Sequence, residues 1–168
     1  MLPAPIPDDD AERLSALRAL LILDTPPEER FDRIVQFAAN EFDVPMALLT
    51  LVDEQRQWFK ARVGLALSEA PRKTSFCGHA VAARDFLVVP DTSKDERFVD
   101  NPMVVGAPFI RSYAGAPLIL ADGYCVGVLC LLDTRQRNLD QLDLAILGTL
   151  RDLIVSELEA QRPSEACA

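Results

Sequence analysis

Apolar side chains recur at helical spacing in three segments of the chain, and each segment predicts a helix. The first covers about 9–23 and begins with acidic residues, which favour a helix N-terminus. The second ends near Phe42, and the third covers about 140–160 with Asp140 as its N-cap. The third carries more apolar residues than one sheet-facing stripe needs. It is therefore expected either to be sandwiched within the domain or to pack against another helix.

The start of the second helix carries a capping signal. Thr25-Pro26-Pro27-Glu28 is interpreted as a capping box, in which the threonine is the N-cap, the first proline takes the first helical position and the glutamate reaches back. The buried face of this helix is predicted to comprise Phe31, Ile34, Val35, Ala38 and Phe42.

Two segments that follow predict strands. The run 46–52 is apolar throughout, as in a central strand, and 57–63 alternates, so together they predict an antiparallel hairpin. In the second strand, one face is assigned Phe59, Ala61 and Val63, and the other Trp58, Lys60 and Arg62. On that polar face, Trp58 is interpreted as a surface or interface aromatic.

The middle of the chain has shorter patterns. Residues 64–74 predict a loop, and a short helix that contains Cys77 and His79 is expected next, followed by a strand at 86–89. Residues 92–108 form a long connection with one helical turn at Asp95–Phe98. Connections of this length inside a compact domain are usually functional or mobile.

The last strands form a second predicted hairpin. Segments 111–120 and 124–132 flank the turn Ala121-Asp122-Gly123. Pro117 inside the first segment predicts a bulge or a strand with one unpaired side. Antiparallel hairpins with flanking helices predict an α+β domain built on a central antiparallel sheet.

Length and charge limit the class of protein. The 168 residues suffice for one well-buried domain, so a single domain over 1–168 is expected, with its core at about 24–160. A net charge of −9 repels phosphate backbones and anionic lipid, so neither nucleic acid nor a membrane surface is expected as a partner. No secretory signal or membrane-spanning run is recognised, and a cytoplasmic location is expected.

The four cysteines are not expected to form disulfides. Cys125 and Cys130 lie an odd number of residues apart in one predicted strand, which assigns them to opposite faces. Cys167 falls in a tail, about 162–168, that is predicted to be disordered. Buried or free thiols in a reducing compartment are the expected state.

Ser75–Ala80 holds the only histidine and one cysteine, and three interpretations stay open. A thiol near a helix N-terminus can have a lowered pKa, but Cys77 and His79 two positions apart on a helix face different directions, which opposes a nucleophile–base pair. A metal site needs further ligands, and the sequence has no second Cys/His pair. In the structural interpretation, Cys77 packs inward and His79 makes a hydrogen bond.

Several segments together resemble a bacterial GAF domain of the sensor type found in front of histidine kinases and diguanylate cyclases. Each is weak alone, but as an ordered set they cover nearly the whole chain. They are Ile22–Asp32, Gln57–Lys60, Ser75–Ala80, Val89–Asp91, Arg97-Phe98 with Asp100–Pro102, Tyr113–Leu118, and Gly127–Cys130 with Asp133.

The resemblance implies a sheet of about five to six strands, with long helices on one face and short helices and loops that cover a small-molecule pocket on the other. The candidate ligand-binding residues that it indicates are Phe76, Cys77, His79, Asp91, Phe98, Asn101, Arg111 and Tyr113. Four of them have an alternative structural role: Asp91 as a turn cap, Phe98 in the core, Arg111 at an exposed strand start and Tyr113 as a plug in the pocket.

The expected function is that of a non-enzymatic sensory domain, which binds an unidentified small molecule and relays its presence through helices 9–23 and 140–160 of a homodimer. A kinase or cyclase is the candidate output partner. One alternative is a dimerisation scaffold with a vestigial pocket.

Enzymatic and cofactor-binding relatives are further alternatives. Phe76-Cys77-Gly78 resembles part of the motif of free methionine-R-sulfoxide reductase, but that enzyme's second cysteine falls where this chain has Ser112-Tyr113-Ala114. The signature of cyclic-nucleotide-binding GAF domains is absent. Gly78 interrupts the Cys-His pair of the tetrapyrrole-binding branch, and a haem ligated by His79 stays open as an alternative.

Overall fold

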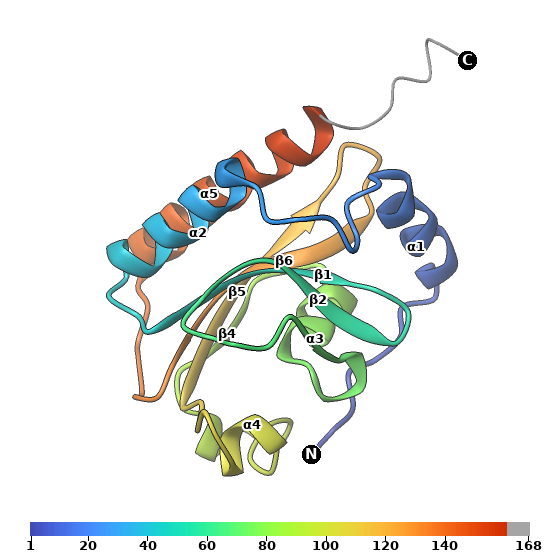
Figure 1. The fold of residues 1–168 in the computed structure, drawn as a ribbon. Helices are drawn as coiled ribbons and strands as arrows, with labels where there is room; N and C mark the ends of the chain where they lie inside the picture. Colours follow the sequence, from blue (N-terminus) through green and yellow to red (C-terminus); the bar gives the residue numbers. More distant parts are fainter. Residues whose placement is uncertain (161–168) are drawn as a thin grey trace, which may run out of the picture.

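The structure, a computed structural model, describes residues 1–160 of the chain. Its centre is a six-stranded antiparallel sheet in the order β3-β2-β1-β6-β5-β4 (Figure 1). The strands are β1 (Met46–Val52), β2 (Arg56–Val63), β3 (Glu69–Pro71), β4 (Leu87–Val89), β5 (Ser112–Ile119) and β6 (Cys125–Asp133). The helices are α1 (Asp10–Ala19), α2 (Glu29–Glu41), α3 (Phe76–Ala83), α4 (Pro102–Val105) and α5 (Gln141–Ala160), with 3-10 turns η1 (Arg72–Thr74) and η2 (Thr92–Lys94). The tail that was predicted to be disordered, with Cys167, lies outside the described residues.

The sheet separates two apolar cores. α2 and α5 lie side by side over one face, whereas α3 and the connection that contains α4 lie on the other (Figure 1). The first core, under α2 and α5, includes Phe31, Val35 and Ile154, and the second, under α3, includes Phe76 and Tyr113. This arrangement confirms the predicted α+β class and its layers. Among the described helices, none has both the length and the apolar content that crossing a bilayer requires.

The first helix is shorter than predicted. α1 ends at Ala19, and Leu21 takes a left-handed conformation with φ of 53° and a 71% exposed side chain. Leu14, Leu17 and Leu20 are all buried, and Leu17 and Leu20 belong to the first core. The apolar stripe of α1 is therefore used inside the domain.

The predicted capping box before α2 is wrong. α2 begins at Glu29, and the preceding Glu28 makes no side-chain capping bond. The Thr25 hydroxyl instead donates to the Ile22 carbonyl oxygen, and Glu28 pairs with the buried Lys60. The Thr25–Glu28 segment is thus fixed by β2 and not by the helix that it precedes. The apolar face of α2 was predicted correctly, with Phe31, Val35, Ala38 and Phe42 buried and Ile34 partly buried.

A β-bulge in β2 overturns the predicted assignment of faces. Leu49 pairs with Ala61 but Thr50 pairs with Phe59, so Lys60 is an extra residue. The bulge places Phe59 in the second core and Ala61 in the first. Trp58, which was predicted at the surface, is 8% exposed and packs in the first core.

A second bulge, in β6, changes the environment of two cysteines. Leu118 pairs with Gly127 and Ile119 with Cys125, which leaves Val126 as the extra residue. Cys125 and Cys130 therefore belong to the same core and not to opposite faces as predicted. Both are free thiols, as is Cys77.

The end of β5 and the start of α5 confirm two sequence predictions. The Pro117 carbonyl oxygen accepts from Arg151 Nη1 at 2.9 Å, on a side of β5 that the short β4 does not reach. Asp140 caps α5, because its Oδ1 accepts from the Asp143 N–H at 2.8 Å while Asp143 Oδ2 accepts from the Asp140 N–H at 3.0 Å. The outer face of α5 is open, with Leu142 67% exposed.

The two connections contain more structure than predicted. β3 and η1 lie within the segment 64–74 that was predicted as a loop. In the connection 92–108, the helical residues are those of η2 and α4, whereas Asp95–Phe98 forms a turn closed by the Phe98 N–H and the Asp95 carbonyl at 3.0 Å. None of the four residues of α4 is fully buried.

Candidate functional site

α3 is fixed at its N-terminus by Ser75. The Ser75 Oγ accepts from the Gly78 N–H at 2.8 Å and donates to the Arg72 carbonyl at 2.7 Å. Gly78 allows the N-terminal residues to pass close by, since a Cβ there would stand 2.6 Å from Ala4 Cβ. This cap orients Cys77 towards the sheet, where its side chain is 2% exposed.

Two thiols and a phenol meet between α3 and the sheet. Cys77 Sγ lies 3.1 Å from Tyr113 Oη and 3.7 Å from Cys130 Sγ, and Cys130 Sγ lies 3.9 Å from Thr50 Oγ1. They border a cavity of about 10 Å³, which has room for about one water molecule. Its walls are Leu48, Gln57, Phe59, Phe76, Cys77, Met103, Tyr113, Cys130 and Leu132.

The proton affinities of these three groups differ. Burial raises the pKa of Tyr113 and of Cys130 well above their usual ranges. Burial also acts to raise the pKa of Cys77, but hydrogen bonds from Cys130, Tyr113 and Thr50 lower it, and the net direction is downward. The sequence anticipated a lowered pKa from the helix terminus, whereas the structure assigns it to side-chain hydrogen bonds.

An aromatic stack closes the site on the side of the long connection. The Phe76 ring stacks on Phe98 at 4.3 Å and on Tyr113 at 5.0 Å between centroids. His79 meets the Phe98 ring edge-on at 4.9 Å, and its Nε2 lies 3.2 Å from the Leu2 carbonyl oxygen. Burial lowers the pKa of His79. His79 therefore ties the N-terminal residues to the stack and does not contact Cys77 as a base would.

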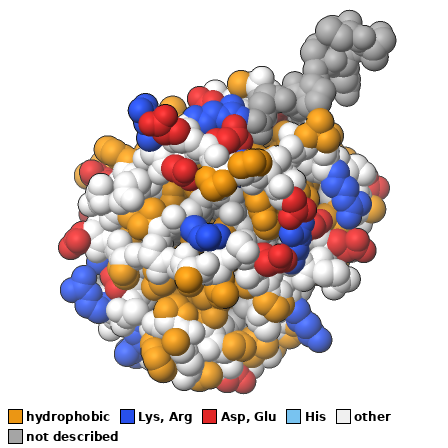
Figure 2. Space-filling view, in the orientation of Figure 1, with side chains coloured by type: hydrophobic (Ala, Val, Ile, Leu, Met, Phe, Trp, Pro, Cys, Tyr) orange, Lys and Arg blue, Asp and Glu red, His pale blue; other side chains and the backbone are white. Residues whose placement is uncertain are grey.

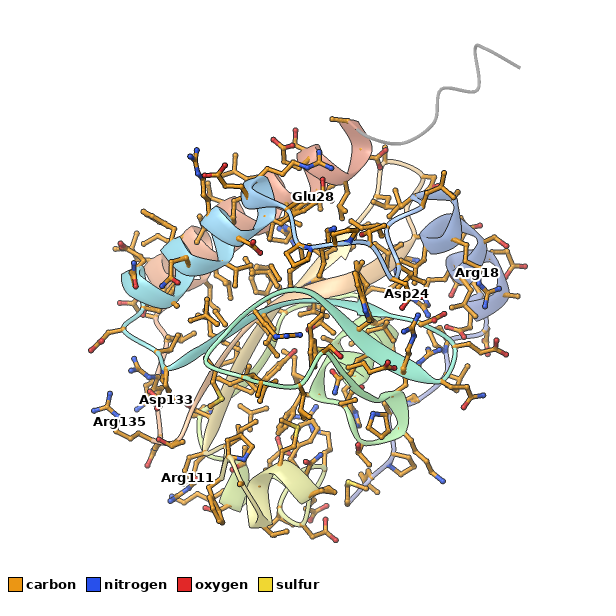
Figure 3. All side chains as sticks on the ribbon, viewed as in Figure 1. Arg18, Asp24, Glu28, Arg111, Asp133 and Arg135 are labelled. Carbon is orange, nitrogen blue, oxygen red and sulfur yellow. The ribbon has the colours of Figure 1, made fainter. Side chains whose placement is uncertain are left out.

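Asp91 and Arg111 form an ion pair away from the cavity. Arg111 Nε and Nη2 donate to the two carboxylate oxygens of Asp91 at 2.8 and 3.1 Å, and Figure 3 places Arg111 beside α4. Asp91 also accepts from the Ser93 N–H at 3.0 Å and so caps η2. Asn101 caps α4 through the Met103 N–H and donates to the Thr74 carbonyl at 2.7 Å. These three polar candidates hold the long connection in place.

Replacing Asp91 by Asn is expected to lower the melting temperature at neutral pH, because the amide loses the ion pair with Arg111. Hydrogen bonds from Arg111 and Ser93 hold the pKa of Asp91 well below its usual range. The stabilisation is therefore fully present above the unfolded-state pKa of about 4 and is lost as pH falls towards the lower folded-state pKa. Thermal melts of both proteins should converge as pH falls below about 4. Asp152→Asn, at a largely exposed carboxylate paired with Arg151, is the control and should melt like the wild type.

The structure thus divides the eight candidate residues into three groups. Phe76, Cys77 and Tyr113 line the cavity, while Phe98 and His79 form the layer behind Phe76. The other three, Asp91, Asn101 and Arg111, bind within the connection. Within residues 1–160, no three His, Cys, Asp or Glu side chains are grouped so that they could hold a metal ion.

Sequence reasoning missed Cys130 as a member of the site. Cys130 lies in the middle of β6, in the regular part of the strand beyond the bulge at Val126, and its side chain belongs to the second core. Pairing β6 with β1 places it beside Leu48, which also lines the cavity. Only the pairing register of β6 with β1 could have identified Cys130 as a member of the site.

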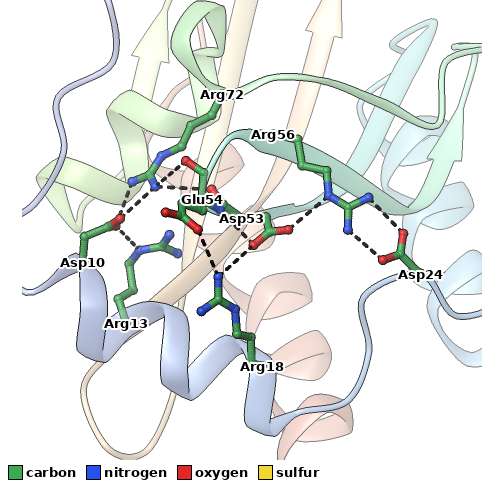
Figure 4. A network of polar contacts seen from close by, with 8 residues as sticks. All are labelled: Asp10, Arg13, Arg18, Asp24, Asp53, Glu54, Arg56 and Arg72. Carbon is green, nitrogen blue, oxygen red and sulfur yellow. Dashed lines mark hydrogen bonds and ion pairs between the residues drawn. The ribbon is translucent and has the colours of Figure 1, made fainter.

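A polar network attaches the N-terminal helix to the same end of α3 (Figure 4). The Asp10 carboxylate accepts from Arg13 Nε at 2.8 Å and from both terminal nitrogens of Arg72, at 2.8 and 3.0 Å. Arg13 and Arg72 are each 2% exposed, and one nitrogen of each has no hydrogen-bond partner among the described residues. Asp10 and Arg72 are 62 residues apart in sequence, so their contact fixes α1 to η1, the turn that precedes α3.

Comparison with known proteins supports one family. Residues 26–158 match the model of the GAF domain. Cyclic di-GMP phosphodiesterase PA2567 of Pseudomonas aeruginosa is 38% identical over 163 residues, which are 96% of this chain and 28% of that protein. The chain thus spans about 28% of the length of this curated relative.

Solved structures show the same fold at lower identity. The GAF domain of Acinetobacter phosphoenolpyruvate-protein phosphotransferase superposes with a TM-score of 0.65 at 19% identity, over 89% of this chain and 94% of that one. Free methionine-R-sulfoxide reductase from Neisseria meningitidis, solved in complex with its substrate, gives 0.64 at 23% identity over 96% and 97%. Since the family model covers most of the chain and the fold agrees, the chain belongs to the GAF domain family, a sensory and regulatory fold.

Proposed function

We propose that this GAF domain is the sensory input module of a signalling protein and that it binds a small molecule between α3, α4 and the sheet. The observation that carries the proposal is the convergence of Phe76, Cys77 and Tyr113, from two separate elements, on one internal cavity. The sequence resemblance to GAF domains indicates the same three residues. A regulatory and not a catalytic role is proposed for them.

The cavity of about 10 Å³ corresponds to a closed state, so a ligand must move part of its wall. α4 is the wall that moves most easily, because none of its residues is fully buried, and Val105 is 63% exposed. Figure 2 shows hydrophobic side chains gathered over this part of the molecule. The remaining walls are apolar, aromatic or thiol, with the amide of Gln57 as a polar group. We therefore expect a small, mainly apolar or aromatic ligand with at least one hydrogen-bonding group.

β6 is the proposed route from the site to the helices. Cys130 and Leu132 face the cavity, while Leu129 and Leu131 on the same strand belong to the core under α2 and α5. A ligand that displaces the cavity face of β6 would therefore change the packing under α5. A kinase, a cyclase or a phosphodiesterase is the proposed recipient of that change.

A dimerisation scaffold with a vestigial pocket is the second candidate function. The side chains that fill the site favour it, as do exposed apolar residues on the outer helices: Phe37 is 53% exposed in α2, and Leu142 and Leu153 are 67% and 51% exposed in α5. α1 is left out of this proposed interface, because Leu14 and Leu17 are buried in the domain. A homodimer through α2 and α5 is the form proposed here.

A thermal-shift screen of small apolar and aromatic metabolites, repeated with two variants, separates the candidates. A true ligand should raise the melting temperature of the wild type. Because Met103 is part of the cavity wall, Met103→Ala should change the affinity for that ligand several-fold and change the shift in melting temperature accordingly. Val105→Ala, two residues further along α4 and exposed, should leave the shift unchanged. A screen without stabilising compounds, with a dimer in light scattering, would support the scaffold. A ligand shift that is equal in all three proteins would place binding elsewhere.

A further inference from the structure

The two thiols at the centre of the site form a pair that neither function above requires. Cys77 comes from the first turn of α3 and Cys130 from the middle of β6, 53 residues apart in sequence. Their Sγ atoms are 3.7 Å apart, both side chains are almost fully buried, and both border the same cavity. Cys125, the third buried thiol within residues 1–160, instead points its Sγ at the Gly127 carbonyl oxygen, 3.5 Å away.

We propose that Cys77 and Cys130 are a redox modification site, at which hydrogen peroxide converts the dithiol into an intramolecular disulfide. A disulfide has an S–S distance of about 2.05 Å, so the two sulfurs must approach by less than about 2 Å. Cys77 lies on the short helix α3, which packs against β1, β5 and β6, and a small shift of this helix supplies that approach.

The reaction proceeds in two balanced steps. The Cys77 thiolate attacks one peroxide oxygen, so that an S–O bond forms and the O–O bond breaks; the departing hydroxide takes up the thiol proton and leaves as water. The Cys130 sulfur then attacks Cys77 Sγ, the S–S bond forms, and the hydroxyl group leaves with the Cys130 proton as a second water. Two thiols lose two electrons in total, and one peroxide is reduced to two waters.

The surroundings assign the roles of the two cysteines. The Tyr113 hydroxyl, 3.1 Å from Cys77 Sγ, can donate to a thiolate there, whereas Cys130 has the Thr50 hydroxyl at 3.9 Å. The pKa of Cys77 is lowered and that of Cys130 is raised by burial, which agrees with Cys77 as the attacking sulfur. The cavity has room for about one water molecule, so a small shift of its wall admits hydrogen peroxide, whereas a bulky disulfide such as oxidised glutathione is expected to be excluded.

The decisive experiment uses the wild-type protein and a chain with Cys125→Ser and Cys167→Ser, in which only the proposed pair remains. Each is treated with hydrogen peroxide, its remaining thiols are alkylated after unfolding, and its peptides are mapped by mass spectrometry. We expect consumption of one peroxide per chain, a loss of two hydrogens and a cross-linked peptide that joins Cys77 to Cys130. Dithiothreitol should reverse the product, and oxidised glutathione should give less than a tenth of it in the same time.

Two single-cysteine substitutions, and a comparison of the folded with the urea-unfolded protein, can each refute the proposal. Cys77→Ala and Cys130→Ala should each abolish the loss of two hydrogens, and cooperative melting of the reduced variants shows that they are folded. Sulfinic acid on either cysteine without a cross-link, a cross-link that contains Cys125, or a folded protein that resists peroxide while its urea-unfolded form cross-links would each overturn the proposal. Because the wild-type peptide map carries the main result, a variant that fails to fold does not weaken the test.

Discussion

Replacing Gly127 by Ala is expected to lower the free energy of unfolding by about 3 kcal/mol or more, or to prevent folding. A Cβ at this position would lie 2.0 Å from the Thr50 carbonyl oxygen and 3.1 Å from Leu51 Cα. Both are backbone atoms of β1, which is paired on one side with β2 and on the other with β6. Because β1 is hydrogen-bonded on both sides, its backbone cannot shift away from the added methyl group. The clash must therefore be relieved by breaking hydrogen bonds between β1 and β6.

Gly148→Ala is the matched control for this substitution. A Cβ at Gly148 approaches the Phe86 side chain at 3.3 Å, and a side chain can rotate away where a backbone cannot. Gly148 lies inside α5, where alanine is favoured over glycine by up to about 1 kcal/mol. Urea unfolding of the two variants should therefore separate them clearly, with Gly148→Ala at or above the wild type. A Gly127→Ala protein within about 1 kcal/mol of the wild type would show that the backbone of β1 does not approach Gly127 this closely.

The bulges in β2 and β6 explain which sequence predictions failed. Strand β1 was predicted with its exact bounds, and the last helix within one residue, because a continuous apolar run and a long period of 3.6 are properties of the elements themselves. Face assignments inside β2 and β6 failed because each strand has one extra residue, at Lys60 and Val126. A bulge depends on the partner strand, so the alternation within a single strand does not reveal it.

The candidate site was predicted in part for a similar reason. Phe76, Cys77 and Tyr113 are apolar or weakly polar, and burying them in the cavity wall satisfies both packing and the family pattern. The charged candidates Asp91 and Arg111 form an ion pair with each other instead. An ion pair within the chain competes with any ligand for the same charged groups. Contacts between distant segments decide whether a polar residue lines the cavity or pairs within the chain. The sequence pattern does not encode these contacts.

Lys60→Met is the second substitution with a large expected effect, about 3 kcal/mol of stability. The Lys60 side chain is fully buried, and its Nζ donates to Thr25 Oγ1 at 2.7 Å and to the Pro26 carbonyl at 2.6 Å. It also pairs with Glu28 Oε2 at 2.7 Å (Glu28 is labelled in Figure 3). Methionine keeps the length and apolar body of the side chain but leaves these acceptors without their donor. The segment before α2 is then expected to detach from β2.

Two neighbouring glutamates provide controls of graded size. Glu28→Gln should cost less than Lys60→Met, because the Glu28 side chain is 37% exposed and water replaces part of the lost interaction. Glu29→Gln should cost less than about 0.5 kcal/mol, since its pair with Arg33 is about three-quarters exposed on both sides. Urea unfolding at pH 7 should give this order. Equal losses at Glu28 and Glu29 would mean that Lys60 is not bound through Glu28.

The same pair predicts how the Lys60→Met effect depends on pH. The hydrogen bond from Lys60 lowers the pKa of Glu28, so the stabilisation from this carboxylate is present above the unfolded-state pKa of about 4.3 and is lost as pH falls through the lower folded-state pKa. Below that range the wild type keeps a buried ammonium group without its carboxylate partner, whereas the methionine variant buries no charge. The stability difference between wild type and Lys60→Met should therefore narrow as pH falls from about 6 to about 3. A difference that stays constant over this range would assign the loss to the bonds with Thr25 and Pro26 alone.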